Sequence, residues 1–312
     1  MATHQWDTDY HAPALVDAVV ELLGKGTLVL DGTLGGGGHS AALLDAGVAR
    51  VIGIDRDADA LVAASARLDG EQAGRFTAYR GNYANLDRIA ELNGVRFTGI
   101  LLDLGISSHQ IDDASRGFSF REGAPLDMRM GDDAIESAAD LLNGSEEQAL
   151  VTIFREFGDE PRAARLVREV VKRRATRPFI TSDDLVGAIR GAFGPRTGAP
   201  EFARLFQAIR IAVNDEIGGI ERALPDLRDR LAPGGTLAII AYHSGEDRLV
   251  KHAFRSWSEA CICPPRHPMC TCGGDHALGA VITRRAVVAQ PDEVARNPRS
   301  RSAKLRAWQR AA

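Results

Sequence analysis

Four short apolar segments, each ending in turn residues, recur early in the chain and constrain its fold more than any other feature. They are TLVLDG at 27–32, RVIGID at 50–55, RFTAYRG at 75–81 and GILLDLG at 99–105. Segments of this length and apolarity are typical of buried parallel strands. Helix-like segments separate them, at 39–45, 58–68 and 86–92. The alternation predicts an α/β fold with a doubly wound, Rossmann-like sheet.

The fifth predicted strand, GTLAIIAYHS, comes only at 235–244. About 130 residues separate it from the fourth, far more than one crossover needs, and helical patterns dominate them. We therefore expect an inserted helical domain at 113–212 that recognises the substrate, while 1–112 and 213–312 form the sheet domain. Apolar residues at helical spacing from Phe206 to Leu231 predict one long helix that returns the chain to the sheet.

A glycine-rich loop, DGTLGGGGHS at 31–40, directly follows the first predicted strand. This is the place where an α/β sheet binds its ligand. The four glycines at 35–38 remove every Cβ from the turn and let the backbone approach a ligand. Asp31 discriminates among ligands, because a carboxylate there repels a pyrophosphate but suits a ligand that carries an ammonium. S-adenosylmethionine carries both an ammonium and a sulfonium.

Two further residues extend this ligand site. Asp55 ends the second predicted strand, where a carboxylate can accept hydrogen bonds from the two ribose hydroxyls of an adenosine ligand. Tyr83 follows the third strand and can stack on adenine, although a half-buried aromatic side chain at a sheet end explains it equally well. Either Asp31 or Asp55 alone can be a helix cap, but the acid, glycine loop and second acid together favour a ligand. A nicotinamide-dependent oxidoreductase is the alternative, with Ser40 in place of its third glycine.

Five longer strings resemble the bacterial 16S ribosomal RNA cytosine-N4 methyltransferases, which modify a cytidine in the decoding region. The strings are DGTLGGGGHS at 31–40, DLGISSHQIDDASRGFSF at 103–120, PLDMRM at 125–130, FQAIRIAVNDE at 206–216 and NPRSRSAKLR at 297–306. The resemblance spans nearly the whole chain. It implies S-adenosylmethionine as methyl donor, 16S ribosomal RNA within the small ribosomal subunit as partner, and a class I methyltransferase domain with a helical insertion. By position, it places the cofactor contacts on Gly37, Gly38, His39, Asp55, Tyr83, Asp103 and Gln110.

Two segments depart from the pattern of that family. The usual FHSLEDR after the fifth strand is YHSGEDR here, with Tyr242 and Gly245, and GAPEFARL replaces a His-Pro-Ala-Thr-Arg-like stretch before FQAIRI. Ser244 and Asp247 match a helix capping box. YHSGEDR therefore has a structural interpretation beside a catalytic one for His243.

Asp103, at the end of the fourth predicted strand, is the predicted catalytic residue. Cytosine N4 is a poor nucleophile because its lone pair is delocalised into the ring, and methylation places positive charge on that nitrogen. A carboxylate that accepts the N4 hydrogens would stabilise this charge, with Ser107 and Ser108 as helpers. The alternative is that Asp103 only binds the cofactor or caps the loop.

The formal net charge of −4 conceals an uneven distribution. Residues 281–312 hold eight basic and two acidic residues, and 162–177 hold seven basic and one acidic. The two patches predict local phosphate contacts, with a solvated helix face as the alternative for 162–177. A non-catalytic ribosome-assembly factor that binds RNA is also compatible with these patches.

The targeting signals that would place the chain in a membrane or outside the cell are missing from the sequence. It has no apolar segment of the roughly 20 residues that a membrane helix needs, and its first residues do not form a secretory signal. We expect a cytoplasmic protein without membrane or DNA partners.

All four cysteines lie within twelve residues, as two CxC pairs: Cys261, Cys263, Cys270 and Cys272. In a cytoplasmic protein such a cluster favours a metal over a disulfide. CxC spacing is less typical of structural zinc than CxxC, so reduced thiols are the default interpretation and we assign no metal site. His267 and His276 are spare candidate ligands.

Overall fold

A computed structural model describes residues 5–7, 12–70, 72–264 and 269–312 of the chain. The chain divides into two compact units, the first formed by 1–105 and 218–312 and the second by 106–217. The domain boundaries expected from the sequence, at 113 and 212, lie a few residues inside the second unit. Its role in substrate recognition stays a prediction.

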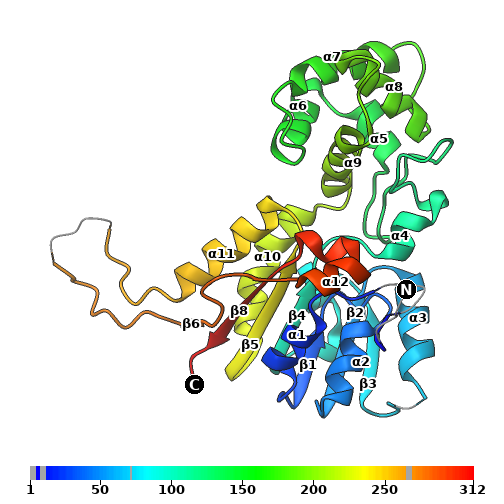
Figure 1. Cartoon of the computed structure of the whole chain (residues 1–312). Coiled ribbons are helices and arrows are strands. Elements are labelled where there is room, and N and C mark those ends of the chain that lie inside the picture. Colours follow the sequence, from blue (N-terminus) through cyan, green and yellow to red (C-terminus); the bar gives the residue numbers. More distant parts are fainter. Residues whose placement is uncertain (1–4, 8–11, 71, 265–268) are drawn as a thin grey trace. The chain divides into compact units, whose positions relative to one another are not determined.

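A single sheet lies at the centre of the first unit, with the strand order β3-β2-β1-β4-β5-β8-β6 and β7 paired with β8 (Figure 1). Its strands are β1 (Leu28–Asp31), β2 (Arg50–Asp55), β3 (Phe76–Arg80), β4 (Phe97–Asp103), β5 (Leu231–Ala241), β6 (Gly279–Val281), β7 (Val287–Val288) and β8 (Lys304–Arg310). β1 to β5 pair in parallel and β8 is antiparallel to β5. The five predicted strands and the Rossmann-like order are confirmed. The order reverses between β1 and β4, which is where open α/β sheets bind ligands.

Helices cover both faces of this sheet. The helices of the first unit are α1 (Val16–Leu23), α2 (Gly38–Asp45), α3 (Ala58–Leu68), α10 (Glu216–Asp229, which begins at the end of the second unit), α11 (Ser244–Trp257) and α12 (Pro291–Arg296). Neighbouring strand residues point to opposite faces: Val29 packs in the cluster that holds residues of α1, α2 and α3, and Leu30 in the cluster that holds residues of α10 and α11. The predicted helix at 86–92 is wrong. The chain there forms two 3₁₀ turns, η1 (Tyr83–Arg88) and η2 (Ala90–Leu92).

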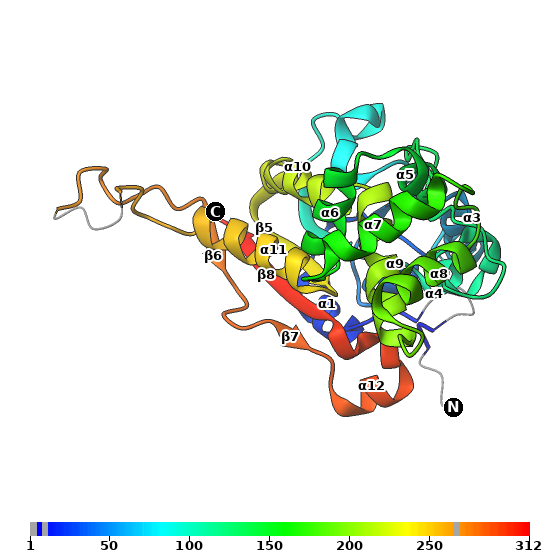
Figure 2. The same cartoon turned by 90° about the horizontal axis from the view of Figure 1, so that it is seen from above.

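The described part of the second unit is mainly helical and has its own hydrophobic core (Figures 1 and 2). Its elements are α4 (Ser108–Asp112), η3 (Ala114–Arg116), α5 (Ala138–Gly144), α6 (Glu147–Glu156), α7 (Ala163–Arg174), α8 (Ser182–Phe193) and α9 (Ala199–Val213). Helix α7 lies within the basic segment 162–177 and is amphipathic. Leu166, Val167 and Val170 are buried there, while Arg165 and Arg168 are exposed. No helix in the described ranges is both long and apolar enough to cross a membrane.

The single helix predicted from Phe206 to Leu231 is wrong, because the chain breaks between α9 and α10. The Asn214 side chain accepts a hydrogen bond from the Met130 amide at 2.8 Å and donates one to the Met128 carbonyl at 2.7 Å. Asp215 follows with a φ of 48°. The tertiary contacts of Asn214 and this left-handed residue end the first helix before the second begins.

The basic C-terminal segment also needs a correction, because residues 304–310 form strand β8 of the sheet. Trp308 is fully buried, and the Arg306 guanidinium donates to both Asp247 carboxylate oxygens, at 2.6 and 3.2 Å. Arg310 donates to the carbonyls of Arg228, Asp229 and Leu231. Arg306 and Arg310 therefore serve the fold, and the phosphate contacts predicted for 281–312 cannot be assigned to the segment as a whole.

Candidate functional site

Three aspartates end three neighbouring strands of the first unit: Asp31 on β1, Asp55 on β2 and Asp103 on β4. β1 pairs with both other strands, with Asp31 opposite Gly53 and Leu101. Since the carboxyl ends of parallel strands meet at one edge of a sheet, these acids and the loop 31–40 share one edge, which we call the glycine-loop edge.

Asp31 is a buried acid with 1% of its surface exposed. Its carboxylate accepts a hydrogen bond from the Ser40 hydroxyl at 2.7 Å and one from the Thr33 amide at 3.3 Å. Burial raises the pKa of Asp31, although the nearby His39 and these hydrogen bonds oppose the rise. The donors to this carboxylate are thus a neutral hydroxyl and a neutral amide.

Asp55 holds the glycine loop in place. One carboxylate oxygen accepts the Gly35 amide at 2.8 Å and the other accepts the Asp57 amide at 2.9 Å. Burial raises the pKa of Asp55 to about 6, against the effect of the two amides. Gly35 has a φ of +51°, a conformation that a side chain disfavours, so this loop geometry needs a glycine.

Gly37 and Gly38 have a packing reason to be glycines. A Cβ on Gly37 would lie 3.1 Å from the Leu68 side chain and 3.2 Å from that of Ala64, and the residue has a φ of +74°. A Cβ on Gly38 would lie 2.7 Å from the Pro13 ring. Both glycines therefore let α2 pack closely. Their predicted contacts with a cofactor stay predictions.

Asp103 is held from three sides. Its amide donates to the Thr33 hydroxyl at 2.6 Å, and its Oδ1 accepts the Tyr242 hydroxyl at 2.9 Å. His39 Nδ1 lies 3.8 Å from Asp103 Oδ2. The other ring nitrogen of His39, Nε2, donates to the Ala14 carbonyl at 2.8 Å, since a carbonyl oxygen only accepts. His39 therefore turns Nδ1 toward the carboxylate.

Sequence reasoning missed the roles of Tyr242, Thr33 and Ser40. Burial and the Asp103 charge raise the pKa of Tyr242 well above its ordinary value, so the phenol stays protonated and donates. Tyr242 lies just beyond β5, and Asp103 pairs with Ile240 on that strand. The pairing of Asp103 with Ile240 would have placed Tyr242 near Asp103. It can be used only when β4 and β5 are known to be neighbours.

Two other predicted cofactor residues lie in ordinary structural positions. Tyr83 begins η1, is half-buried and packs against the core cluster of Leu86, so stacking on adenine and plain packing both stay open. Gln110 belongs to the second unit. Its side-chain Oε1 accepts the Ser107 backbone amide at 3.0 Å, and its backbone amide donates to the Ser107 hydroxyl at 3.1 Å. This capping box starts α4, and a cofactor role for Gln110 stays a prediction.

The capping box predicted at Ser244 and Asp247 is wrong by one residue. His243 is the N-cap of α11, and the buried Glu246 carboxylate accepts the amides of Tyr242 at 2.9 Å and His243 at 3.3 Å. Asp247 instead binds Arg306. Although burial opposes ionisation, the hydrogen bond and charge of Arg306 hold the pKa of Asp247 below its ordinary value.

The sequence of this chain is similar to those of known methyltransferases. The model of the MraW methylase family matches residues 8–311. The chain is 61% identical over 303 residues to the ribosomal RNA small subunit methyltransferase H of Gemmatimonas aurantiaca, covering 97% of this chain and 96% of that protein. It is 48% identical to the protein of the same name from Anaeromyxobacter dehalogenans, covering 95% and 96% of the two chains. The protein of that name from Heliobacterium mobile is 44% identical, with 96% and 99% covered.

Solved structures match more distantly. An rRNA methylase from Streptococcus thermophilus aligns with 95% of this chain and 94% of its own, at 12% identity and a TM-score of 0.42. A resemblance of that size is too weak to support a conclusion about the site.

Proposed function

The chain belongs to the MraW methylase family, and from this premise we propose that it methylates the N4 amino group of a cytidine in the decoding region of 16S ribosomal RNA. S-adenosylmethionine is the methyl donor, and the small ribosomal subunit presents the RNA. The names of the relatives support ribosomal RNA of the small subunit as substrate. The choice of cytosine N4 is the finer part of the proposal.

One observation carries the ligand assignment: Asp31, which is buried, and Asp55, which is partly buried, accept hydrogen bonds from neutral donors. The Ser40 hydroxyl and the Thr33 amide donate to Asp31, and two backbone amides donate to Asp55. Burial raises the pKa of both carboxyl groups, which means that the edge destabilises their charged forms. A ligand with its own positive charge relieves this cost at Asp31, while its ribose hydroxyls add hydrogen-bond donors to Asp55. S-adenosylmethionine has an ammonium and a sulfonium, whereas the pyrophosphate of NAD would add negative charge.

Each of these residues then contacts a different part of the cofactor. Asp55 accepts the ribose hydroxyls, Asp31 faces the ammonium, and Tyr83 lies beside the adenine. The backbone of Gly37 and Gly38 approaches the cofactor at the start of α2. His39, whose Nδ1 lies 3.8 Å from the Asp103 carboxylate, contacts the methionine end. For Gln110, only the resemblance to the family supports a cofactor contact.

Asp103 is the proposed catalytic residue. Its carboxylate accepts an N4 hydrogen of cytosine, which localises the nitrogen lone pair and stabilises the positive charge that forms as the N–C bond is made. The methyl group would pass from the sulfonium to N4, which leaves S-adenosylhomocysteine as a neutral thioether, and the methylated N4 would give one proton to the Asp103 carboxylate. Tyr242 fixes the direction of this carboxylate through its hydrogen bond to Oδ1, and the Thr33 hydroxyl accepts the backbone amide of Asp103. Orientation of the base toward the methyl group contributes much of the rate.

The second unit supplies cations for the RNA backbone. Arg165, Arg168 and Lys172 are exposed on α7, opposite its buried apolar face. Other basic residues of the same helix serve the fold instead: Arg173 pairs with Glu169, and Arg174 donates to the carbonyls of Leu142 and Ser145. The exposed three are the group we assign to phosphate contacts.

The test is methyl transfer to small ribosomal subunits purified from cells that lack this modification. Labelled S-adenosylmethionine is added, the RNA is digested, and the nucleosides are separated by mass spectrometry. We expect label in N4-methylcytidine from one position of 16S ribosomal RNA. Label in another nucleoside would contradict the N4 assignment, and binding without any transfer would favour the assembly-factor alternative. Calorimetry with NAD, for which we expect no binding, tests the oxidoreductase alternative.

A further inference from the structure

Residues 258–264 and 269–278, from the segment that joins α11 to β6, extend away from the sheet and its helices in both views (Figures 1 and 2). The ends of this segment are tied by hydrogen bonds from the His276 amide to the Ala260 carbonyl, at 3.0 Å, and from the Leu278 amide to the Trp257 carbonyl, at 2.8 Å. Its described residues, 258–264 and 269–278, contribute to none of the three hydrophobic clusters. Hydrophobic packing therefore does little to order the described residues of this segment, which we call the cysteine loop.

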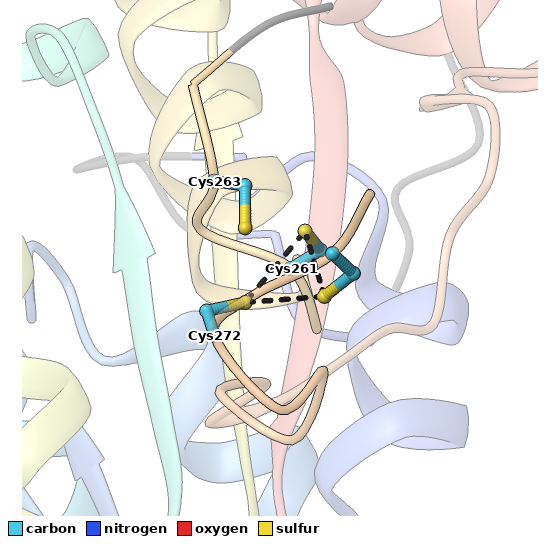
Figure 3. A group of neighbouring side chains, drawn as sticks. Cys261, Cys263 and Cys272 are labelled. Atoms are coloured by element: carbon cyan, nitrogen blue, oxygen red, sulfur yellow. Dashed lines mark hydrogen bonds between the residues drawn. The ribbon is translucent and has the colours of Figure 1, made fainter. Parts of the chain in front are cut away.

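The four cysteines of the cysteine loop gather their sulfurs in one place. Sγ of Cys261 lies 3.7 Å from Sγ of both Cys270 and Cys272, and the latter two sulfurs are 3.6 Å apart. All four sulfurs, including that of Cys263, lie within 4.8 Å of one another. Figure 3 shows the sulfur of Cys263 pointing toward those of Cys261 and Cys272.

These separations match a tetrahedral metal site. Zinc bound to four thiolates has Zn–S bonds of about 2.3 Å, so each pair of ligand sulfurs is about 3.8 Å apart. A disulfide would instead need two sulfurs at about 2.05 Å. The triangle formed by Cys261, Cys270 and Cys272 therefore has the size of one face of a zinc tetrahedron, and Cys263 is close enough to complete it.

The backbone supports the same arrangement. The amide of Ile262, the middle residue of the first CxC, lies 3.4 Å from the sulfur of Cys272 in the second. The amide of Thr271, the middle residue of the second CxC, lies 3.3 Å from the sulfur of Cys263 in the first. Each turn thus directs an amide at a sulfur of the other. Such N–H···S contacts favour thiolates, which are the form that binds metal.

We propose that Cys261, Cys263, Cys270 and Cys272 together bind one zinc ion in a structural site. Four protein ligands leave no open position for water or substrate, so the ion has no catalytic role. Sulfur ligands select zinc over magnesium and calcium, which prefer oxygen. His276 is not needed, since its Nε2 contacts the Cys272 carbonyl at 2.7 Å, and His267 lies outside the described residues. The ion replaces the missing hydrophobic core of the cysteine loop.

The experiment measures metal in the full-length protein, purified without chelator from cells grown with zinc. We expect about one zinc ion per chain by inductively coupled plasma mass spectrometry, and its loss in Cys261→Ser and in Cys272→Ser. Ile262→Val is the matched control, because it changes a loop side chain but keeps the amide that contacts Cys272. Replacement of zinc by cobalt should give a sulfur-to-cobalt charge-transfer band and the intense d–d bands of tetrahedral cobalt.

A second measurement separates the metal site from a general effect on folding. Removal of zinc by a chelator should expose the cysteine loop to protease while the melting temperature of the sheet changes little, and added zinc should restore protection. The proposal would be overturned by a chain with four freely titrating thiols that takes up no added zinc. It would equally be overturned by bound iron, or by a mass that shows a disulfide in the freshly purified protein.

Discussion

Both units bury acids, but they neutralise them differently. In the second unit, Glu160 is 1% exposed and accepts hydrogen bonds from Arg162 and Arg204, which hold its pKa below the ordinary value despite burial. At the glycine-loop edge of the first unit, Asp31 and Asp55 accept neutral donors and burial raises the pKa of each. Glu160 thus pairs with cations of its own unit, whereas the hydrogen bonds to Asp31 and Asp55 come from neutral donors.

We expect this difference to distinguish Glu160, a structural acid, from Asp31 and Asp55 at the proposed cofactor site. A buried carboxylate without a cation costs stability, and such a cost is retained where it contributes to binding or chemistry. A buried carboxylate held by arginine is already satisfied and offers little to a ligand. Substitutions at the glycine-loop edge should therefore change cofactor binding and methyl transfer, while substitutions at the paired acids should change folding.

The largest effect is expected for Asp103→Asn. Asparagine keeps the size of the side chain but supplies only a neutral acceptor, so the single-turnover rate of methyl transfer should fall by about 10² to 10³. The rate is measured on undermethylated small subunits at saturating S-adenosylmethionine, where weakened cofactor binding cannot contribute. A rate within a few-fold of the wild type would limit Asp103 to cofactor binding.

Asp55→Ala should weaken S-adenosylmethionine binding by about 1 to 3 kcal/mol, because the ribose hydroxyls lose a charged acceptor. The loop also loses the two contacts through which Asp55 holds Gly35 and Asp57. Calorimetry gives the dissociation constant, and RNA affinity should stay the same. An unchanged dissociation constant would remove Asp55 from the cofactor site.

The pH dependence of cofactor binding should follow Asp55, whose pKa in the ligand-free protein is about 6. The raised pKa means that the folded chain holds this proton more tightly than the unfolded chain, so the group favours folding in acid and loses that contribution as the pH rises through about 6. The cofactor needs the ionised form. Affinity should thus fall by roughly tenfold per pH unit below that value.

The control for this titration is Asp55→Ala, in which the component near pH 6 should disappear. Calorimetry between about pH 5 and about pH 7.5 spans the transition of an acid shifted this far. If wild type and variant lost affinity in parallel, another group, such as Asp31, would be responsible.

Glu160→Gln tests the other half of the comparison. Two arginines lose their common charged partner, so the free energy of unfolding should fall by about 1 to 2 kcal/mol, less than for a fully buried pair because both arginines are partly exposed. Chemical denaturation measures the change. The cofactor dissociation constant should not move, and a shift in it would blur the distinction between the two kinds of acid.

The smallest effect is expected for Tyr242→Phe, which removes one hydrogen bond to Asp103 and keeps the ring. A loss of about 0.5 to 1.5 kcal/mol corresponds to a rate roughly 2- to 12-fold lower. Single-turnover kinetics at saturating cofactor should show the decrease in the rate constant itself. A normal rate would mean that the Tyr242 hydrogen bond is not needed to hold the carboxylate in place.

Sequence patterns predicted the parts of the molecule that are determined by residues close together in the chain. Strands β1 to β5 are apolar and are followed by turn residues, so they could be predicted. Asp31, Asp55 and Asp103 could be placed at the ends of β1, β2 and β4 without a structure. The break at Asn214 could not be predicted, because it depends on hydrogen bonds to Met128 and Met130 in another part of the chain.

The C-terminal strand and the environment of Asp103 were hidden for the same reason. β8 reads as a basic tail until Asp247 and β5 are known to lie beside it. The bond from Tyr242 to Asp103 depends on the register of β4 and β5, which no local pattern specifies. Contacts between distant segments, rather than propensities, decided each point on which the expectations were incomplete.

β4 and β5 are neighbours in the sheet, although the whole second unit separates them along the chain. Bringing the two strands together across an unfolded segment of that length carries an entropic cost that grows with its logarithm. The second unit is continuous in sequence and has its own core, so we expect it to fold early and thereby shorten the distance to be closed. The sheet would then be completed last. A chain stopped midway through folding would have its helical part in place but could not yet bind a methyl donor.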